Sequence, residues 1–340
     1  MFICTWKTQF QLRRPCIPMA ADNVFNRLPM YDTIHWHNPL NFMASHFPAS
    51  ADDDEDNALR NHPFLQKVSL SESFRVLDDW EMVHTPTAFG ISFSGAGFLG
   101  IYHLGAVNAL LQHAPRLASR IEKFAGASAG SLAAAMMCCC PDKLHETKEA
   151  LFAMSRSINA KYPFKRDICV MSLLEGNLRK IIPGHAHKVA SGRLFISITH
   201  ANTMENTIVS NYDDNEELMQ ALLSSCYIPF YAKSDAPSID GDQYIDGGFS
   251  DFLPRFHDLP TITVSPFHGN YDICPHGGVK RTLTPTMRRH NMDMYVNPSN
   301  LYRFARALFP PNNEVLNQYF KAGETDCIGF LHRTKRFQES

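Results

Sequence analysis

The feature that most constrains the fold is a turn at residues 126–130, whose sequence GASAG reads G-x-S-x-G. Residues 121–125 before it have the pattern of a short strand. Residues 131–137 after it are rich in alanine, leucine and methionine, which favour helix. Gly126 and Gly130 lack a Cβ, so the backbone can turn sharply from strand into helix without a clash. The sequence therefore predicts an α/β protein with Ser128 at the tip of a strand.

A serine in this position has a chemical use. Its hydroxyl becomes a nucleophile only when it is held rigidly and a base accepts its proton. The N-terminus of the following helix, including the Ala129 amide, would face the negative charge that develops during an attack on a carbonyl. The alternative is an ordinary Gly/Ser turn, because small residues often produce this pattern by chance.

The rest of the chain continues the alternation of strands and helices from about residue 88. Such alternation indicates a sheet covered on both faces. Strands are expected at 88–94, 121–125, 193–199, 207–210, 244–246 and 261–264, and helices at 98–112, 131–137, 142–160, 170–182 and 214–225.

Composition excludes several classes of protein. A net charge of −2 does not indicate a nucleic-acid-binding protein. Nine cysteines without a C-x-x-C pair, three of them adjacent at 138–140, indicate a reducing compartment rather than a disulfide framework. The adjacent three are expected to be buried small hydrophobes, with acylation as the alternative. No apolar run reaches the roughly 18 residues that a membrane span requires.

The chain divides into three expected regions. Residues 1–85 are proline-rich with an acidic run at 52–56, which indicates a poorly structured extension. This region has no clear signal peptide, while a transit peptide is the remaining alternative. Residues 86–275 carry the regular α/β pattern, and residues 276–340 are expected to form a helical segment packed on or following it.

A second glycine-rich turn precedes the first helix. Residues 95–100, here called the glycine loop, read GAGFLG. Its candidate binding residues are Gly95, Ala96, Gly97 and Gly100, which would act through their backbone. The pattern G-x-G-x-x-G is also typical of a dinucleotide-binding loop, with Glu122 as the residue that would bind the ribose. Such a residue stands at the end of the second strand, whereas Glu122 stands at the start of its strand. The favoured interpretation is an oxyanion hole, in which backbone amides face the oxygen that becomes negative in acyl transfer.

Asp246 is the best candidate for the base. It follows the apolar strand residues Tyr244 and Ile245, so it should be buried with a raised pKa, and Gly247 and Gly248 let the chain turn away. An aspartate that caps a turn is the alternative. A Ser-His-Asp triad is also open, with five histidines after Asp246: His257, His268, His276, His290 and His332.

Taken together, the glycine loop, the serine turn and the Asp246-Gly247-Gly248 motif resemble the signature set of the patatin-like phospholipase family. Further stretches, including residues 190–194, 261–267 and 300–311, resemble its animal adipose triglyceride lipase branch. The resemblance covers about residues 89–333. It implies a three-layer α/β/α sandwich with a mostly parallel central sheet, in which residues 86–275 are the catalytic domain.

The resemblance also implies a function. Ser128 would be the nucleophile, Asp246 its base in a Ser-Asp dyad, and the glycine loop with Ala129 the oxyanion hole, without metal or organic cofactor. The expected reaction is hydrolysis of long-chain acyl glycerols, foremost triacylglycerol. Alternatives are a phospholipase A-type or transacylase reaction, or a non-catalytic lipid-droplet protein.

The expected partner is lipid at a droplet or membrane surface in the cytoplasm, with an α/β-hydrolase-fold co-activator implied by the resemblance. Residues 299–309 place Leu301, Phe304, Ala305 and Leu308 on one helical face. That face predicts either an interfacial helix or a helix packed on the core.

Overall fold

The computed structural model describes residues 87–160, 169–229, 235–276 and 285–334. All of them belong to one compact unit, Ala49–Ser340. The expected N-terminal extension and its acidic run lie outside the described residues. The three-region division of the chain therefore stays a prediction.

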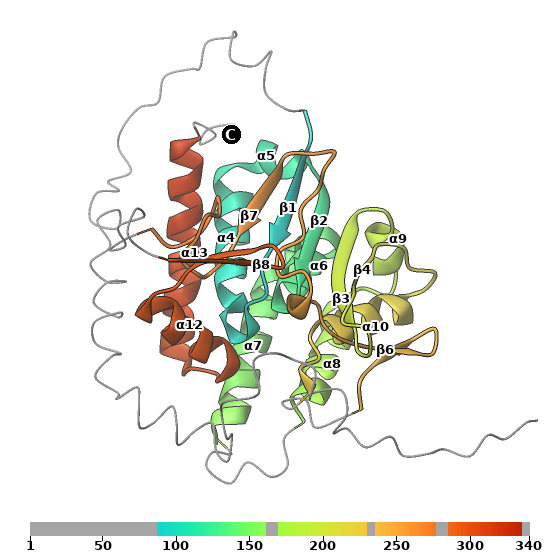
Figure 1. Ribbon diagram of the computed structural model, residues 1–340. Coiled ribbons are helices and arrows are strands. Elements are labelled where there is room, and N and C mark those ends of the chain that lie inside the picture. Colours follow the sequence, from blue (N-terminus) through green and yellow to red (C-terminus); the bar gives the residue numbers. More distant parts are fainter. Residues whose placement is uncertain (1–86, 161–168, 230–234, 277–284, 335–340) are drawn as a thin grey trace, which may run out of the picture. The chain divides into compact units, whose positions relative to one another are not determined.

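A seven-stranded sheet forms the centre (Figure 1). Hydrogen bonds connect its strands in the succession β5-β6-β3-β2-β1-β7, and β4 also pairs with β3. Strands β2 and β6 pair with successive parts of β3. The pairs β1–β2, β1–β7 and β2–β3 are parallel, whereas β4, β5 and β6 join antiparallel. The strands are β1 Phe89–Phe93, β2 Ile121–Ala127, β3 Leu194–His200, β4 Asn206–Val209, β5 Ser238–Ile239, β6 Asp242–Asp246 and β7 Thr261–Val264. A separate hairpin pairs β8 Thr286–Arg289 with β9 Met292–Tyr295.

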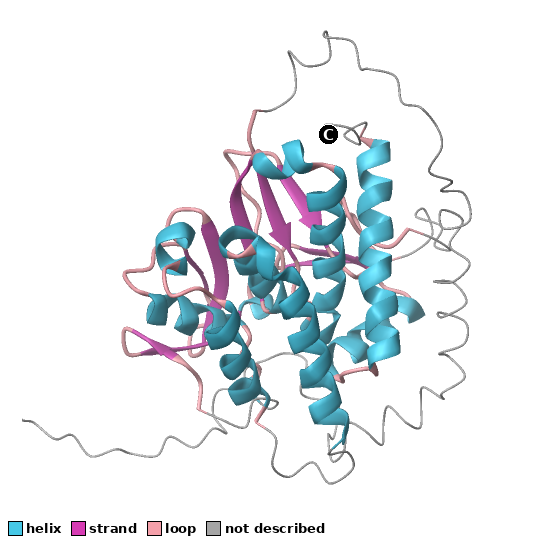
Figure 2. Cartoon of the chain, turned by 180° about the vertical axis from the view of Figure 1, so that it is seen from behind, coloured by secondary structure: helices cyan, strands magenta, loops and turns pink. Residues whose placement is uncertain are grey.

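Helices flank this sheet, and Figure 2 shows several of them lying across the strands. The α-helices are α4 Gly100–His113, α5 Pro115–Ser119, α6 Ala129–Cys139, α7 Leu144–Ala160, α8 Val170–Ile181, α9 Ala186–Ala190, α10 Asn215–Ser225, α12 Pro298–Leu308 and α13 Asn313–Arg333. Short 3₁₀ turns are η2 Gly97–Leu99, η3 Pro141–Lys143 and η4 Gly247–Phe249.

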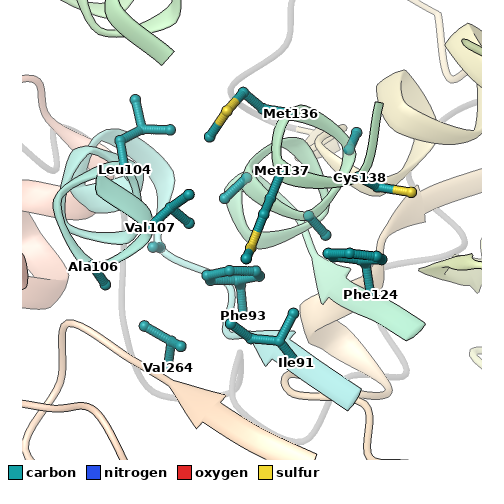
Figure 3. Packing of buried hydrophobic residues seen from close by; sticks show 14 of the residues in the cluster. Ile91, Phe93, Leu104, Ala106, Val107, Phe124, Met136, Met137, Cys138 and Val264 are labelled. Carbon is teal, nitrogen blue, oxygen red and sulfur yellow. The ribbon is translucent and has the colours of Figure 1, made fainter. Parts of the chain in front are cut away.

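The core lies between the parallel strands and helices α4 and α6. All five residues of β1 are buried, as expected for a central strand covered on both faces. Figure 3 shows Ile91 and Phe93 of β1 beside Phe124 of β2, beneath Val107 of α4 and Met137 of α6. This packing fixes the carboxyl ends of β1 and β2, where the two glycine-containing turns begin.

Helix α13 packs closely along α4 because each helix presents a glycine to the other (Figure 1). A Cβ on Gly105 would lie 1.9 Å from the Phe320 carbonyl oxygen, and one on Gly323 would lie 2.1 Å from the Tyr102 carbonyl oxygen. The two backbones can therefore approach only because both positions lack a side chain.

The expected fold class is confirmed: the chain is an α/β protein with helices flanking a mostly parallel sheet. Several short elements had not been expected, namely α5, α9, β5 and the β8–β9 hairpin. The hairpin falls in the region expected to be helical, where α12 and α13 follow it. None of the helices in the described part of the chain is both long and apolar enough to span a bilayer.

Candidate active site

Ser128 occupies the turn between β2 and α6 in a strained backbone conformation. Its φ of 54° and ψ of −132° lie in a region that non-glycine residues rarely adopt. A Cβ on Gly126 would lie 2.3 Å from the Gly130 carbonyl carbon, and one on Gly130 would lie 2.2 Å from the Phe93 carbonyl oxygen. Both motif glycines are thus required by space, as the sequence predicted.

A second serine holds this turn in place. The Ser128 amide donates to the Ser225 hydroxyl at 2.8 Å, and that hydroxyl donates to the Ser197 carbonyl at 2.7 Å. The Ser128 carbonyl accepts from the amide of Ser131 at 2.9 Å and from its hydroxyl at 2.7 Å. The backbone of Ser128 is therefore fixed on both sides, which stabilises its unusual dihedral angles.

Strand register brings Asp246 to Ser128. Strand β4 pairs with residues 196–199 along one edge of β3, so β2 and β6 share the other edge. On that edge Ala127 lies opposite Ser197, and Asp246 lies opposite Ile198. Strand β2 runs parallel to β3 and β6 runs antiparallel, so their carboxyl ends meet. Ser128 follows the first end, and Asp246 is the last residue of the second.

The Asp246 carboxylate is buried and oriented by its own turn. Its Oδ1 accepts from the Gly248 amide at 2.8 Å, and a Cβ on Gly247 would lie 2.0 Å from the Ser197 carbonyl oxygen. Burial raises the pKa of Asp246 from its ordinary value of 3.8 to about 6, while hydrogen bonds from the Ser128 hydroxyl and Gly248 lower it. The expected burial and pKa direction are therefore found, and a carboxylate near neutrality suits a general base.

The glycine loop lies directly beside the serine turn. A Cβ on Gly95 would lie 3.8 Å from that of Ser128, and one on Gly100 would lie 3.0 Å from that of Ala129. Close packing of the two turns leaves little room for side chains on the loop. This matches the expectation that strands β1 and β2 bring both turns to one edge of the sheet.

The amides of this region fall into two groups. The Gly95 amide donates to the Phe252 carbonyl at 3.1 Å, so it anchors the loop instead of facing a substrate. The first amide donor within η2 is that of Leu99, which donates to the Ala96 carbonyl. The first amide donor within α6 is that of Ser131, which donates to the Ser128 carbonyl. The amides that precede them, including those of Gly97 and Ala129, are first-turn donors. They are the better oxyanion candidates.

Gly97 is the most constrained residue of the loop. Its φ is +51°, and a Cβ there would lie 2.1 Å from the Ala307 carbonyl oxygen of α12. The loop is thus held from outside by a helix more than two hundred residues later in the chain. Ala96 itself is buried and precedes η2 as its N-cap.

The histidines of the described segments lie outside the contacts of this pair. Among the described residues, the hydrogen bonds of the Ser128 and Asp246 side chains involve no histidine ring. His268 is buried with its pKa lowered to about 3, chiefly by desolvation, and its amide donates to Asn300. The geometry therefore favours a dyad over a triad.

The dinucleotide alternative also lacks support. Glu122 is exposed at the start of β2, whereas Ser128 follows its end, six residues later. At about 3.3 Å per residue the two lie roughly 20 Å apart along the strand. The described residues contain no group of three or more His, Cys, Asp or Glu that could hold a metal ion.

Three residues around the pair were missed by sequence reasoning. Ser225 and Cys226 end α10, and the Cys226 thiol lies within hydrogen-bonding reach of the Ser128 hydroxyl. The Tyr227 carbonyl accepts the Asp246 amide at 2.8 Å. Nothing local in the sequence marks them, because their role comes from the position of α10 against β3 and β6.

Comparison with known proteins agrees with this site. The family model for patatin-like phospholipases matches residues 91–257, which include the glycine loop, the serine turn and the Asp246 motif. Human patatin-like phospholipase domain-containing protein 4 is 35% identical over 256 residues, covering 73% of this chain and 98% of that protein. The chain belongs to the patatin-like phospholipase family.

Longer family members are equally similar. Patatin-like phospholipase domain-containing protein 2 of Bos taurus is 39% identical, covering 73% of this chain and 51% of its own length. The human protein named 1-acylglycerol-3-phosphate O-acyltransferase PNPLA3 is 37% identical, and the match covers 74% of this chain and 52% of that protein. The chain thus spans about half the length of these two relatives. One of these relatives is named for its patatin-like phospholipase domain and the other as an acyltransferase.

Proposed function

We propose that this patatin-like phospholipase is a serine lipase that hydrolyses long-chain acyl esters of glycerol, foremost triacylglycerol, through Ser128 and Asp246. The observation that carries the proposal is the strand register. Ala127 and Asp246 lie opposite consecutive residues of β3, and the Ser128 side chain hydrogen-bonds Asp246, which supports Ser128 as nucleophile and Asp246 as its base. The resemblance to the adipose triglyceride lipase branch supports the choice of acyl glycerols.

The reaction would proceed in two steps. Asp246 accepts the Ser128 proton as Oγ attacks the ester carbonyl, and first-turn amides of Gly97 and Ala129 stabilise the oxyanion. The tetrahedral intermediate collapses to an acyl-serine, and the protonated Asp246 gives its proton to the departing alcohol. Water then attacks the acyl-serine with Asp246 again as base, which releases the fatty acid and restores both side chains.

The alternatives differ in substrate or acceptor. A phospholipase A-type enzyme would use the same dyad on a phospholipid, and a transacylase would replace water with an alcohol. The human PNPLA3 relative is named as an acyltransferase, which supports keeping acyl transfer in the test. A lipid-droplet protein without catalysis would not need the contact between Ser128 and Asp246.

One experiment separates these functions. Wild type and Ser128→Ala would be incubated with a fluorophosphonate probe, and in parallel with triolein, phosphatidylcholine, and triolein plus monoacylglycerol acceptor. We expect labelling and triolein hydrolysis by wild type only. Faster hydrolysis of phosphatidylcholine than of triolein would favour the phospholipase. Transfer of most acyl groups to the monoacylglycerol acceptor would favour the transacylase. Absence of labelling together with absence of all turnover would contradict the enzyme proposal.

For location we propose a peripheral lipid surface, with co-activation by an α/β-hydrolase-fold protein carried over as a proposal from the resemblance. Leu301 and Phe304 on α12 are 54% and 44% exposed, while Ala307 on the same helix is buried and its carbonyl lies against Gly97. Ala305 and Leu308 are half-buried, so α12 both packs on the core and presents apolar side chains outward. Flotation with triolein droplets should weaken in Leu301→Asp/Phe304→Asp, and unchanged flotation would argue against α12 as the contact.

A further inference from the structure

A cavity of about 100 Å³ lies between helices α4, α6, α7 and α8. Among the described residues that line it, only Thr147 and Asn177 are polar. Leu104 and Met136 line it from α4 and α6, on the side of these helices away from the sheet (Figure 3). The cavity is therefore separate from the core between the sheet and these helices, and it is suited to an apolar ligand.

One end of the cavity is the candidate oxyanion hole. Gly97 and Gly100 of the glycine loop and Ala129 of the serine turn all contribute to its wall. Ala129 adjoins Ser128, and its amide is a first-turn donor. When an ester is bound with its carbonyl carbon at Ser128, that carbon thus lies beside the apolar cavity.

Helix α8 supplies a second observation. Its apolar residues Met171, Leu174, Leu178 and Ile181 recur at helical spacing, yet only Leu178 is fully buried. Leu174, Leu178 and Ile181 line the cavity. Neighbouring side chains normally pack against an apolar stripe until it is fully buried. The apolar stripe of α8 is not fully buried, so space for a ligand remains beside it.

The dimensions suit an extended chain. The wall on α6 runs from Ala129 to Met136, about 10 Å at 1.5 Å per residue. An apolar cavity of about 150 Å³ holds one benzene molecule, so about 100 Å³ accommodates roughly four carbons of an acyl chain. A glycerol or phosphate group would find too few hydrogen-bonding partners there.

We propose that this cavity binds the acyl chain of the substrate ester, with the carbonyl at Gly97 and Ala129 and roughly the first four carbons of the chain along α6 and α8. The proposal rests on the proposed function, because it assumes that an ester is cleaved at Ser128. It assigns chain-length selectivity to the residues that line the cavity.

The test narrows the cavity with a phenylalanine. Ala150 of α7 is half-buried and lines the cavity, whereas Ala153 on the same helix is exposed and does not. Ala150→Phe should lower kcat/KM for p-nitrophenyl palmitate at least roughly tenfold and leave that for p-nitrophenyl acetate within about twofold. Ala153→Phe should leave both unchanged. An equal effect of Ala150→Phe on both esters, or none, would overturn the proposal.

A second pair of variants covers the case in which Ala150→Phe does not fold. Leu174→Trp narrows the cavity from α8, and Ser172→Trp is its control because Ser172 is exposed on the same helix. The same esters are used, with the same expected contrast. Thermal melting of each variant shows whether it is folded before its kinetics are compared.

Binding without catalysis distinguishes failure of this proposal from failure of the proposed function. In Ser128→Ala, titration calorimetry with 1-decanol should show binding that Ala150→Phe abolishes and Ala153→Phe retains. If wild type cleaves no ester but this contrast holds, the proposed function fails, and the cavity is an alkyl-chain site that serves no ester substrate. If 1-decanol binds all variants equally, or none, the cavity assignment fails even when esters are cleaved.

Discussion

The Ser128 amide donates to the Ser225 hydroxyl at 2.8 Å, which ties the serine turn to the end of α10. Ser225→Ala would leave a buried amide without an acceptor, which costs about 1–3 kcal/mol. Because the turn also orients the nucleophile, we expect kcat to fall roughly 10- to 100-fold with little change in KM. Steady-state kinetics on a soluble ester measures both constants.

Ser224→Ala is the matched control for that variant. Ser224 is equally buried on the same helix, but within the described part of the chain its hydroxyl has no hydrogen-bond partner. Its loss should change neither kcat nor the unfolding midpoint appreciably. Equal losses of kcat in the two variants would show that α10 packing, and not the bond to Ser128, supports activity.

The pH dependence of activity should report on Asp246. Burial raises the pKa of this carboxyl to about 6, and the base must be ionised to accept the Ser128 proton. We therefore expect kcat/KM to be constant above about pH 7 and to fall about tenfold per pH unit well below 6. Asp251→Asn, which alters a nearby carboxyl, should keep this profile. A profile without a transition between pH 5 and 7 would contradict Asp246 as the base.

Asp246→Asn should inactivate the enzyme while stabilising the fold at neutral pH. The folded pKa is about 6 and the ordinary value is 3.8, so the folded state binds the proton more tightly. Wild-type stability thus falls as pH rises from about 4 to 6, by about 3 kcal/mol in total, and stays lower above 6. The uncharged amide side chain of the variant avoids that cost. Melting curves at pH 7.5 should show a higher midpoint for the variant, and a lower midpoint would argue against a costly buried charge.

Gly97→Ala should disable the oxyanion hole. The new Cβ would meet the Ala307 carbonyl oxygen at 2.1 Å in a backbone with a φ of +51°, so the loop must shift. Loss of one oxyanion donor typically lowers kcat about 10²- to 10³-fold. Gly192→Ala is the control, because Gly192 has a φ of +75° but nothing within 4 Å of the added Cβ. It should lose about 1 kcal/mol of stability without loss of kcat.

The local parts of this site could be predicted from sequence. Gly126 and Gly130 predicted the turn at Ser128 because their constraint is steric and acts within five residues. The end of a short apolar strand predicted burial of Asp246. Strand β7 was found because all four of its residues are β-branched, which favours strand.

The remainder depends on contacts between distant segments. Ser225 lies 97 residues from Ser128, and a serine near the end of a helix carries no sign of what it will bond. Whether the Gly95 amide was free could not be predicted either, because its acceptor, Phe252, belongs to the chain after β6. Likewise, the contact of Ala307 with Gly97 follows from how α12 packs on the glycine loop.

Tyr102→Phe should destabilise the α4–α13 packing in a pH-dependent manner. The Tyr102 hydroxyl donates to Asp326 Oδ2 at 2.7 Å, and both residues are buried. Burial raises the pKa of Asp326 from 3.8 to about 7, while the bond from Tyr102 and the charges of Arg303 and Arg333 lower it. Removing the hydroxyl therefore raises this pKa further and penalises the ionised form.

The loss of stability should follow the charge on Asp326. At pH 8.5 the carboxylate is ionised and loses a charge-assisted hydrogen bond, so unfolding in urea should become easier by about 1–3 kcal/mol. At pH 5.5 Asp326 is protonated with or without Tyr102, and the loss should be about 1 kcal/mol or less. On an Asp326→Asn background the pH dependence of the Tyr102→Phe effect should vanish. An equal loss at both pH values in the single variant would mean that packing of the ring, and not the hydrogen bond to the carboxylate, is what the substitution disturbs.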